Sequence, residues 1–300
     1  MPSPLILFLM IFFLLECTIG IIENSFIIIV LGREWVQCWT LLPGDMILAS
    51  LSISRFFLQG AAVFSNFFSY FFLTSRKLYI DIFWNFANTV SFWFTTWLAV
   101  FYCVKISSFT HPIFLWLKWR ISGFVPWLLL WSLVICILIF ILSFVKTSLV
   151  FQLPVTGNYS EKTTFDDVIR AFQSHFLLPL QMFILLIPFL FFLASTILLI
   201  SSLCRHLRNM QHRSAGPQHP SMQVHVTTVK SLFFFLILYA LYVLPIIISL
   251  AAPISVCSSH YWVWEIVIYS GISIHSAFLI LNSSKLRRAL KKMLHYREAA

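Results

Sequence analysis

The sequence predicts an all-α membrane protein: a seven-transmembrane helix bundle followed by a short amphipathic C-terminal helix. Two observations support this. The 300 residues are 60% hydrophobic and only 10% charged, whereas an average soluble protein carries about 25% charged residues. The apolar residues also gather in long stretches separated by short polar ones, as membrane spans do. One bundle would use the whole chain, so we expect residues 1–300 to form a single domain.

Seven apolar stretches reach the roughly 20 residues that cross a bilayer. They cover residues 5–31, 45–72, 80–104, 124–145, 175–203, 226–251 and 262–281. We expect helices, because these stretches do not show the alternating polarity of barrel strands. The first stretch could instead be a secretory signal, but it lacks a basic start and runs too long. It is therefore expected to be a retained helix.

Basic residues concentrate on one side of the predicted membrane. That side holds Arg33, Lys105, Lys118, Arg120, Arg205, Arg208, Arg213, Lys230, Lys285, Arg287, Arg288, Lys291, Lys292 and Arg297. The positive-inside rule then predicts a multi-pass plasma-membrane protein with an extracellular N-terminus and a cytoplasmic C-terminus. The acceptor sequence Asn158-Tyr159-Ser160 falls in the longest outward connection, so Asn158 is a candidate glycosylation site. The net charge of +10 predicts contact with membrane lipid and acidic partners, without nucleic acid.

Cysteine and histidine spacing points away from metal and redox chemistry. Only Cys257 of the six cysteines falls clearly in an outward segment, so the predicted outer loops supply no disulfide. No Cys/His spacing resembles a zinc site, and no catalytic constellation or phosphate-binding loop stands out. We therefore expect a protein that is not an enzyme and that holds no metal or cofactor.

Polar residues within apolar spans are costly and mark functional or structural sites. Glu23 and Asn24 lie in the first stretch and Arg55 lies in the second. A buried Arg keeps its charge and offers five donors, so it needs carbonyls, Asn24, or a carboxylate such as Glu23 or Asp45. Two interpretations stay open: structural glue between helices one, two and seven, or a switch network that rearranges on activation.

A second group of aromatic and polar residues lies nearer the outer half of the spans. Trp84 and Asn88 are four residues apart and share one helical face, and Glu265 follows two tryptophans in the last span. Aromatic rings with a few polar groups between helices are typical of a small-molecule site. Trp262 and Trp264 are instead expected to anchor at the membrane interface.

The predicted cytoplasmic face interleaves aromatic and basic residues over Phe101–Arg120. The tail at residues 285–295 repeats apolar residues at helical spacing with a basic opposite face, which predicts an amphipathic helix on the inner leaflet. Pro188 and Pro245 lie inside the fifth and sixth stretches. They are either hinges or ordinary membrane-helix prolines.

The segment Phe101–Arg120 resembles the inner end of helix three and the second inner loop of the bitter taste receptors. Further segments resemble the family in the same chain order. They are Asn24 with residues 31–35, residues 45–48 with 54–55, Trp84 with Asn88, and residues 188–211, 225–239 and 275–286. The resemblance covers nearly the whole chain except the outer loops. It implies a G-protein-coupled receptor for small bitter compounds that activates a gustducin-type heterotrimeric G protein.

The resemblance also implies roles for individual residues. The expected ligand-binding residues are Trp84, Asn88, Trp93, Gln181, Tyr239 and Glu265. The expected structural or switching residues are Asn24, Arg55, Pro188, His206, His275 and Ser276. The expected G-protein-coupling residues are Lys105, Lys118, Arg120 and Arg205.

One departure and three alternatives remain. The family commonly places Asn eight residues after the position of His275, where this chain has Ser283, with Asn282 one residue earlier. A one-residue shift rotates a side chain by about 100° around a helix, so Asn282 is a doubtful replacement. A secondary transporter should show internal repeats, which we do not see. A pheromone receptor is closer but lacks the Phe101–Arg120 and His275-Ser276 features, and a membrane enzyme has no constellation to support it.

Overall fold

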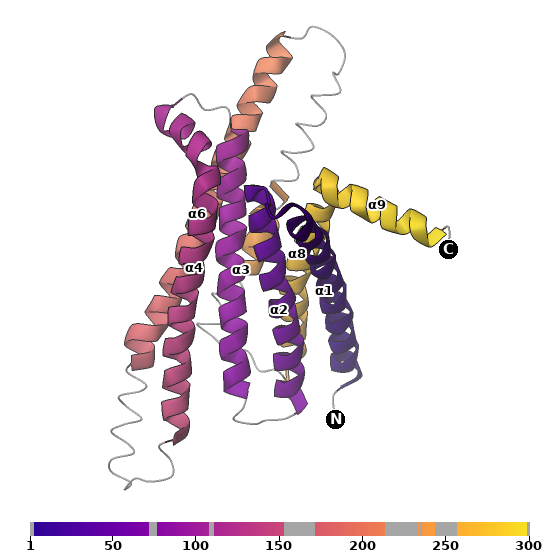
Figure 1. Ribbon diagram of the computed structural model, residues 1–300. Coiled ribbons are helices and arrows are strands. Elements are labelled where there is room, and N and C mark those ends of the chain that lie inside the picture. Colours follow the sequence, from indigo (N-terminus) through magenta and orange to yellow (C-terminus); the bar gives the residue numbers. More distant parts are fainter. Residues whose placement is uncertain are drawn as a thin grey trace.

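The computed structural model describes residues 3–71, 77–107, 111–152, 172–213, 233–234, 236–243 and 257–298. The named helical elements are α1 (Pro4–Cys38), α2 (Pro43–Phe71), α3 (Lys77–Ile106), α4 (Pro112–Gln152), the short π-helix η2 (Gln173–Leu177), α6 (Leu178–Arg213), α8 (Ser259–Asn282) and α9 (Ser284–Glu298). Residues 236–243 are also helical. Figure 1 shows the long helices side by side, with α9 projecting from one end of the bundle.

The helical membrane bundle predicted from the sequence is confirmed. Six of the described helices are long and apolar enough to cross a membrane. The predicted sixth span, residues 226–251, falls largely outside the described residues. Only residues 233–234 and the helical segment 236–243 of this span are described. The helices that the structure describes are therefore consistent with seven spans without fixing that number.

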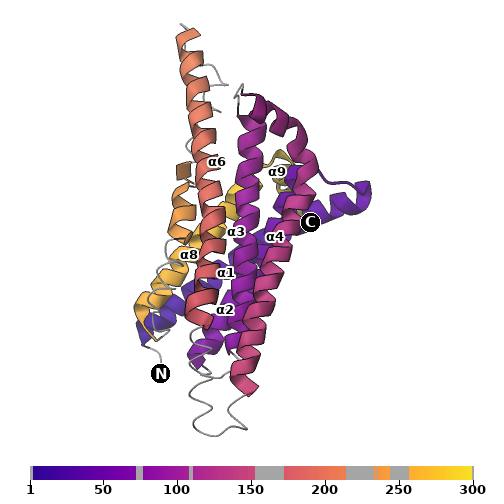
Figure 2. The same cartoon turned by 90° about the vertical axis from the view of Figure 1, so that its left-hand side faces the viewer.

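Helix α3 runs through the middle of the bundle. It packs against α2, α4 and α6, while α1 packs against α2 and α8. Figure 1 shows α3 beside α2, and Figure 2 shows α3 between α4 and α6. This central position means that polar side chains on different faces of α3 reach different neighbouring helices.

Local sequence explains where α1 begins and ends. The Ser3 hydroxyl accepts a hydrogen bond from the backbone N–H of Ile6 at 3.3 Å, and Pro4 occupies the first helical position. The helix continues past the predicted end at residue 31 and closes at Trp39, whose φ of 55° is in the left-handed region. That conformation is unusual for a bulky residue. The Trp39 N–H donates to the carbonyl of Trp35 at 2.7 Å, which terminates the helix.

Helix α4 also begins earlier than predicted. It starts at Pro112 rather than near residue 124, so the segment expected to be an inner loop is helical. Proline suits the first turn of a helix because its missing N–H would have no helical partner there. Figure 1 shows this first part of α4 bent away from the rest of the helix. Two helices contain internal prolines, Pro126 in α4 and Pro188 in α6, whereas Pro245 lies outside the described residues.

The junction between α8 and α9 explains the serine that replaces the expected asparagine. Ser283 has extended backbone torsions and donates its N–H to the Leu279 carbonyl at 3.1 Å, closing α8. Its hydroxyl accepts from the N–H of Leu286 at 3.4 Å and so caps the start of α9. Asn282, the last residue of α8, is exposed.

The predicted amphipathic tail is present as α9. Its Leu286 side chain is fully buried against the end of the bundle where α8 ends, and Leu290 packs beside it. Met293 and Leu294 are exposed farther along the helix. The charged side chains Arg287, Arg288, Lys291 and Lys292 are exposed. The helix therefore combines an anchored beginning with a basic, solvent-accessible remainder.

Candidate functional site

Arg55 is the centre of a buried polar network inside the bundle. Its Nη1 donates to Ser276 Oγ at 3.1 Å, and its Nη2 donates to Thr95 Oγ1 at 3.4 Å. Nη2 also lies 2.5 Å from Nδ1 of His275, which must accept because a guanidinium only donates. Nδ1 of His275 therefore carries no proton in this arrangement. These contacts tie α2 to α3 and α8.

The network continues to α1 through Asn24. Ser276 Oγ donates to Asn24 Oδ1 at 3.2 Å, and Asn24 Nδ2 donates to the Gly20 carbonyl at 2.7 Å. Asn24 Nδ2 also reaches Gln59 Oε1 at 3.3 Å, and Gln59 Nε2 donates to Ser273 Oγ at 3.2 Å. Four helices thus share one set of hydrogen bonds, as buried polar groups require.

The expected partners of Arg55 need correction. Asn24 belongs to the network, although it is linked through Ser276 rather than directly. Within the described residues no carboxylate hydrogen-bonds Arg55, so the suggestion of Asp45 was wrong, whereas the charge of Glu23 acts on Arg55 without a hydrogen bond. Asp45 lies about three helical turns away along α2 and accepts from Lys285 instead. Oε2 of Glu23 is buried and has no hydrogen-bond partner.

A second polar cluster lies toward the opposite end of the bundle from α9. Asn66 Nδ2 donates to Glu265 Oε2 at 2.9 Å, and the Tyr261 hydroxyl donates to Asn66 Oδ1. Nearby, Ser65 Oγ donates to Asp81 Oδ1 at 2.5 Å. Glu265 is therefore held between α8 and α2.

Trp262 of α8 does not lie at a lipid interface. Trp262 is fully buried, and its ring packs edge-on against Phe13 at 5.8 Å and Phe67 at 6.0 Å between ring centroids. Trp264 is partly buried against the same cluster. The expected interfacial role was wrong for Trp262, because its face of α8 packs on α1 and α2 rather than on lipid.

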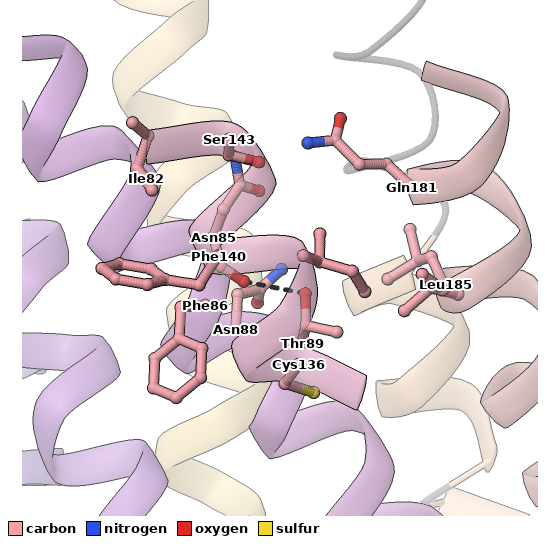
Figure 3. A pocket seen from close by; sticks show the side chains of 12 residues that line it. Ile82, Asn85, Phe86, Asn88, Thr89, Cys136, Phe140, Ser143, Gln181 and Leu185 are labelled. Carbon is pink, nitrogen blue, oxygen red and sulfur yellow. Dashed lines mark hydrogen bonds between the residues drawn. The ribbon is translucent and has the colours of Figure 1, made fainter. Parts of the chain in front are cut away.

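A narrow cavity of about 40 Å³ lies between α3, α4 and α6. Its polar lining comes from Asn85, Asn88 and Thr89 of α3, Ser143 of α4 and Gln181 of α6. Figure 3 shows Gln181 reaching toward the cavity from the side opposite Asn85 and Ser143. All three helices also contribute apolar side chains to the lining. The site therefore combines an apolar surface with a few polar groups, as ligand sites do.

The six expected ligand-binding residues do not share one site. Asn88 and Gln181 line the cavity, and Asn88 also accepts from the Tyr242 hydroxyl. Trp84 turns toward α8, where its Nε1 donates to the Tyr269 hydroxyl at 2.6 Å. Trp93 is buried in a hydrophobic cluster with residues of α1, α2 and α4, and its ring lies 5.9 Å from that of Trp97 on the same helix.

The remaining two expected ligand-binding residues lie elsewhere. Tyr239 lies beside Arg55 and lines a different, smaller cavity. Glu265 belongs to the Asn66 cluster described above.

Comparison with known proteins decides the class of this bundle. The family model described as "Taste receptor protein (TAS2R)" matches residues 1–298. Taste receptor type 2 member 134 of Rattus norvegicus is 46% identical over 94% of this chain and 84% of its own length. Member 62 of Pan paniscus is 44% identical over 97% of this chain and 93% of its own. Member 41 of Mus musculus is 39% identical over 98% and 97%, respectively.

The chain belongs to the type 2 taste receptor family. It is therefore a taste G-protein-coupled receptor of the plasma membrane and not an enzyme, as the resemblance at its inner segments predicted. Within the part of the receptor that the structure describes, no group of three or more His, Cys, Asp or Glu residues is placed to hold a metal ion.

Several residues that take part in these hydrogen-bond networks of the receptor were not predicted from the sequence. Gln59 follows Arg55 by four residues on α2, and Ser273 precedes Ser276 by three on α8. Both spacings place the pair on one helical face, which was a readable signal. Asn66 carries no such signal, because its partners Glu265 and Tyr261 come from a distant helix.

The expected coupling residues of the taste receptor fall into two groups. Lys105 donates to the Lys118 carbonyl at 3.2 Å, and Lys118 donates to the Ser107 carbonyl at 3.4 Å, so both are engaged within the receptor. Arg120 is exposed, with its guanidinium 5.9 Å from the centre of the Trp116 ring. Arg205, with the neighbouring His206, is exposed near the end of α6.

Lys285 ties α9 to the bundle. Its Nζ lies 2.7 Å from Glu34 Oε1 on α1 and 2.6 Å from Asp45 Oδ2 on α2. Partial burial opposes its charge, but the hydrogen bonds and charges of Asp45 and Glu34 prevail and raise the pKa of Lys285 above its ordinary 10.5. Because the pKa is raised, this stabilisation is fully present below pH 10.5 and is lost only as pH rises beyond the pKa in the folded receptor.

Lys285→Gln is expected to lower the thermal unfolding midpoint of the purified receptor by about 2–4 °C, since a partly exposed ion-pair network contributes on the order of 1 kcal/mol. A thiol-reactive dye can report unfolding through the buried thiols of Cys17 and Cys103. Arg287→Gln removes a charge from the exposed face of the same helix and serves as the control. Equal shifts for both variants, or a difference that disappears between pH 7 and 9, would contradict the assignment.

Proposed function

We propose that this receptor binds small bitter compounds within the helix bundle and activates a gustducin-type heterotrimeric G protein. The observation that carries the proposal is the cavity between α3, α4 and α6, where Asn88 and Gln181 face a shared space. The names of the relatives describe taste receptors, and the cavity supplies the apolar walls and sparse polar groups that such ligands need.

The cavity is small, which bears on the mechanism. Sites for drug-sized ligands usually measure about 300–1000 Å³, far above the 40 Å³ found here. An agonist therefore needs α6 to move away from α3 and α4. A compound that binds the opened bundle better than the closed one stabilises the opened form by that difference in affinity.

The inner face supplies the surface for the second partner. Arg120 and Arg205 are exposed, and so are the basic side chains of α9. A basic surface steers an acidic partner and suits anionic lipid on the inner leaflet. Movement of α6, which contributes both Gln181 and Arg205, would connect the ligand cavity to this surface.

We also propose that the N-terminus is extracellular and that α9 lies on the cytoplasmic side, within a single domain of residues 1–300. The exposed basic side chains of α9 support this orientation. Asn158, the proposed glycosylation site, lies outside the described residues. An N-terminal epitope tag stained in intact cells tests the orientation: staining that requires permeabilised cells would reverse it.

Gln181→Leu is expected to raise the half-maximal concentration of agonists at least tenfold. No hydrogen bond of the Gln181 side chain to another described residue is found, so the substitution removes a cavity donor and acceptor without breaking the fold. Intracellular calcium in cells expressing the receptor with a promiscuous gustducin-like G protein, screened with a panel of bitter compounds, provides the measurement. The same screen tests the proposed function itself.

Gln37→Leu, the same substitution at an exposed position on α1, is the control and should leave the dose–response curve unchanged. A response to bitter compounds that both variants preserve would move the binding site away from this cavity. A well-expressed surface receptor that stays silent across a broad panel would argue against the proposed ligand class.

Glu265→Gln is expected to weaken cationic or hydroxyl-rich agonists more than neutral apolar ones, by about tenfold. The carboxylate is positioned by Asn66 and lies near Tyr261, and the substitution removes its charge while keeping its shape. The calcium assay with matched charged and neutral agonists gives the ratio. Equal losses for both groups would exclude a ligand-recognition role for Glu265.

A further inference from the structure

A second cavity, of about 20 Å³, lies directly beside Arg55. Its polar lining comes from Arg55, Thr95, Tyr239, Tyr242 and His275, and these residues belong to α2, α3, α8 and the helical segment 236–243. A polar cavity needs about 10–15 Å³ to hold one water molecule, so this space can hold an occupant of at least that size.

Among the described residues, two buried polar atoms of the residues that line the cavity have no well-aligned hydrogen-bond partner. They are Nε of Arg55 and the hydroxyl of Tyr239, which lies near Thr96 without a well-aligned hydrogen bond to it. Arg55 is 4% exposed and Tyr239 is 7% exposed, so water outside the bundle does not satisfy them. Both groups can donate a hydrogen bond, and a buried donor left unpaired costs about 1–3 kcal/mol.

Arg55 also has no hydrogen-bonded counter-charge among the described residues, although the charge of Glu23 acts on it. Its described hydrogen-bond partners, Ser276, Thr95 and His275, are all neutral. Buried charges in proteins are normally paired, because transfer of an isolated ion out of water is very costly. The closest candidate for compensation is Glu23 on α1, but it forms no ion pair with Arg55.

We propose that this cavity binds a small monovalent anion, with chloride as its natural occupant. A guanidinium N–H and a phenol O–H on two residues that line the same cavity are donors of the kind an anion requires, and the guanidinium supplies the opposite charge. Water would satisfy the two donors but would leave Arg55 without a hydrogen-bonded counter-charge. The anion would join the segment 236–243 to the Arg55 network through Tyr239.

Purified receptor in lipid nanodiscs provides the test, with thermal unfolding measured in sodium chloride, sodium bromide and sodium gluconate at equal ionic strength. A site that is occupied in the folded receptor alone raises the midpoint by mass action. We expect midpoints in chloride and bromide about 3 °C above the midpoint in gluconate, which is too large for the cavity.

Tyr239→Phe should reduce this halide-dependent shift to less than 1 °C. Tyr261→Phe removes a hydroxyl that bonds Asn66 in the distant cluster, so it should keep the full shift. Glu23→Gln should keep or enlarge the shift, because it removes the competing negative charge.

Three outcomes would overturn the proposal. Equal midpoints in all three salts would mean that water alone fills the cavity. A halide shift that survives Tyr239→Phe would place the anion elsewhere. A halide shift that appears only in Glu23→Gln would show that the carboxylate is the natural counter-charge. None of these depends on an agonist, so failure here is distinguishable from failure of the proposed bitter-compound site.

Discussion

Gly20→Ala is expected to lower the free energy of unfolding by about 2–3 kcal/mol, and the thermal midpoint with it. A Cβ at Gly20 would lie 2.0 Å from Gln59 Nε2 and 2.6 Å from Ser273 Oγ. Gln59 is fully buried, so it cannot swing into open space. To make room, it must give up its bonds to Asn24 and Ser273, which join α1, α2 and α8.

Gly32→Ala on the same helix is the matched control, since a Cβ at Gly32 meets no atom within 4 Å. Alanine also favours a helix over glycine by up to about 1 kcal/mol, so Gly32→Ala should be neutral or slightly stabilising. Dye-monitored unfolding of both purified variants gives the comparison. If Gly20→Ala melted like Gly32→Ala, the close approach of α1 to Gln59 would be refuted.

Arg55→Met is expected to abolish the agonist response and to lower the free energy of unfolding by about 2–4 kcal/mol. The substitution removes the bonds to Ser276, Thr95 and His275. The bond from Gln59 to Ser273 remains as a link between α2 and α8, so we expect a folded but weakened bundle. Arg55→Lys should be intermediate, because a single ammonium cannot span the same three acceptors.

The comparison of unfolding and signalling separates the two interpretations of this network. Structural glue predicts that the midpoint and the calcium response fall together, and this is the outcome we expect from the number of bonds lost. A switch predicts a lost response with a nearly unchanged midpoint. Arg33→Met, which removes an exposed Arg from α1, should change neither. If Arg55→Met also changed neither, both interpretations would be refuted.

The sequence was most informative about polar residues, because an unpaired polar side chain inside a membrane has a high free-energy cost. Arg55, Asn24 and Ser276 were expected to act together, and they do lie in one network. The cost of an unpaired polar group in lipid makes such residues conspicuous. Their partners were less predictable: Thr95 and Gln59 are uncharged, and their roles depend on how α2, α3 and α8 are rotated toward one another.

The rotation of each helix about its own axis could not be predicted from the sequence, and this explains the wrong predictions. Lipid and the bundle interior are both apolar, so hydropathy does not distinguish a lipid-facing ring from a buried one. Trp262 was therefore expected at the interface but is buried against α1 and α2. For the same reason Trp84 and Asn88, although four residues apart on α3, contact different neighbours.

The attachment of α9 has a consequence for the depth at which Arg55 lies in the bilayer. Lys285 holds Asp45 at the end of the bundle where α9, proposed to lie on the leaflet surface, begins. Ten residues along α2 separate Asp45 from Arg55, a rise of about 15 Å, and half the thickness of a typical hydrocarbon core is about the same. If α9 lies on the leaflet surface as proposed, the guanidinium lies near the bilayer midplane, farther from either headgroup layer than an arginine side chain can extend, and its charge has to be accommodated within the protein.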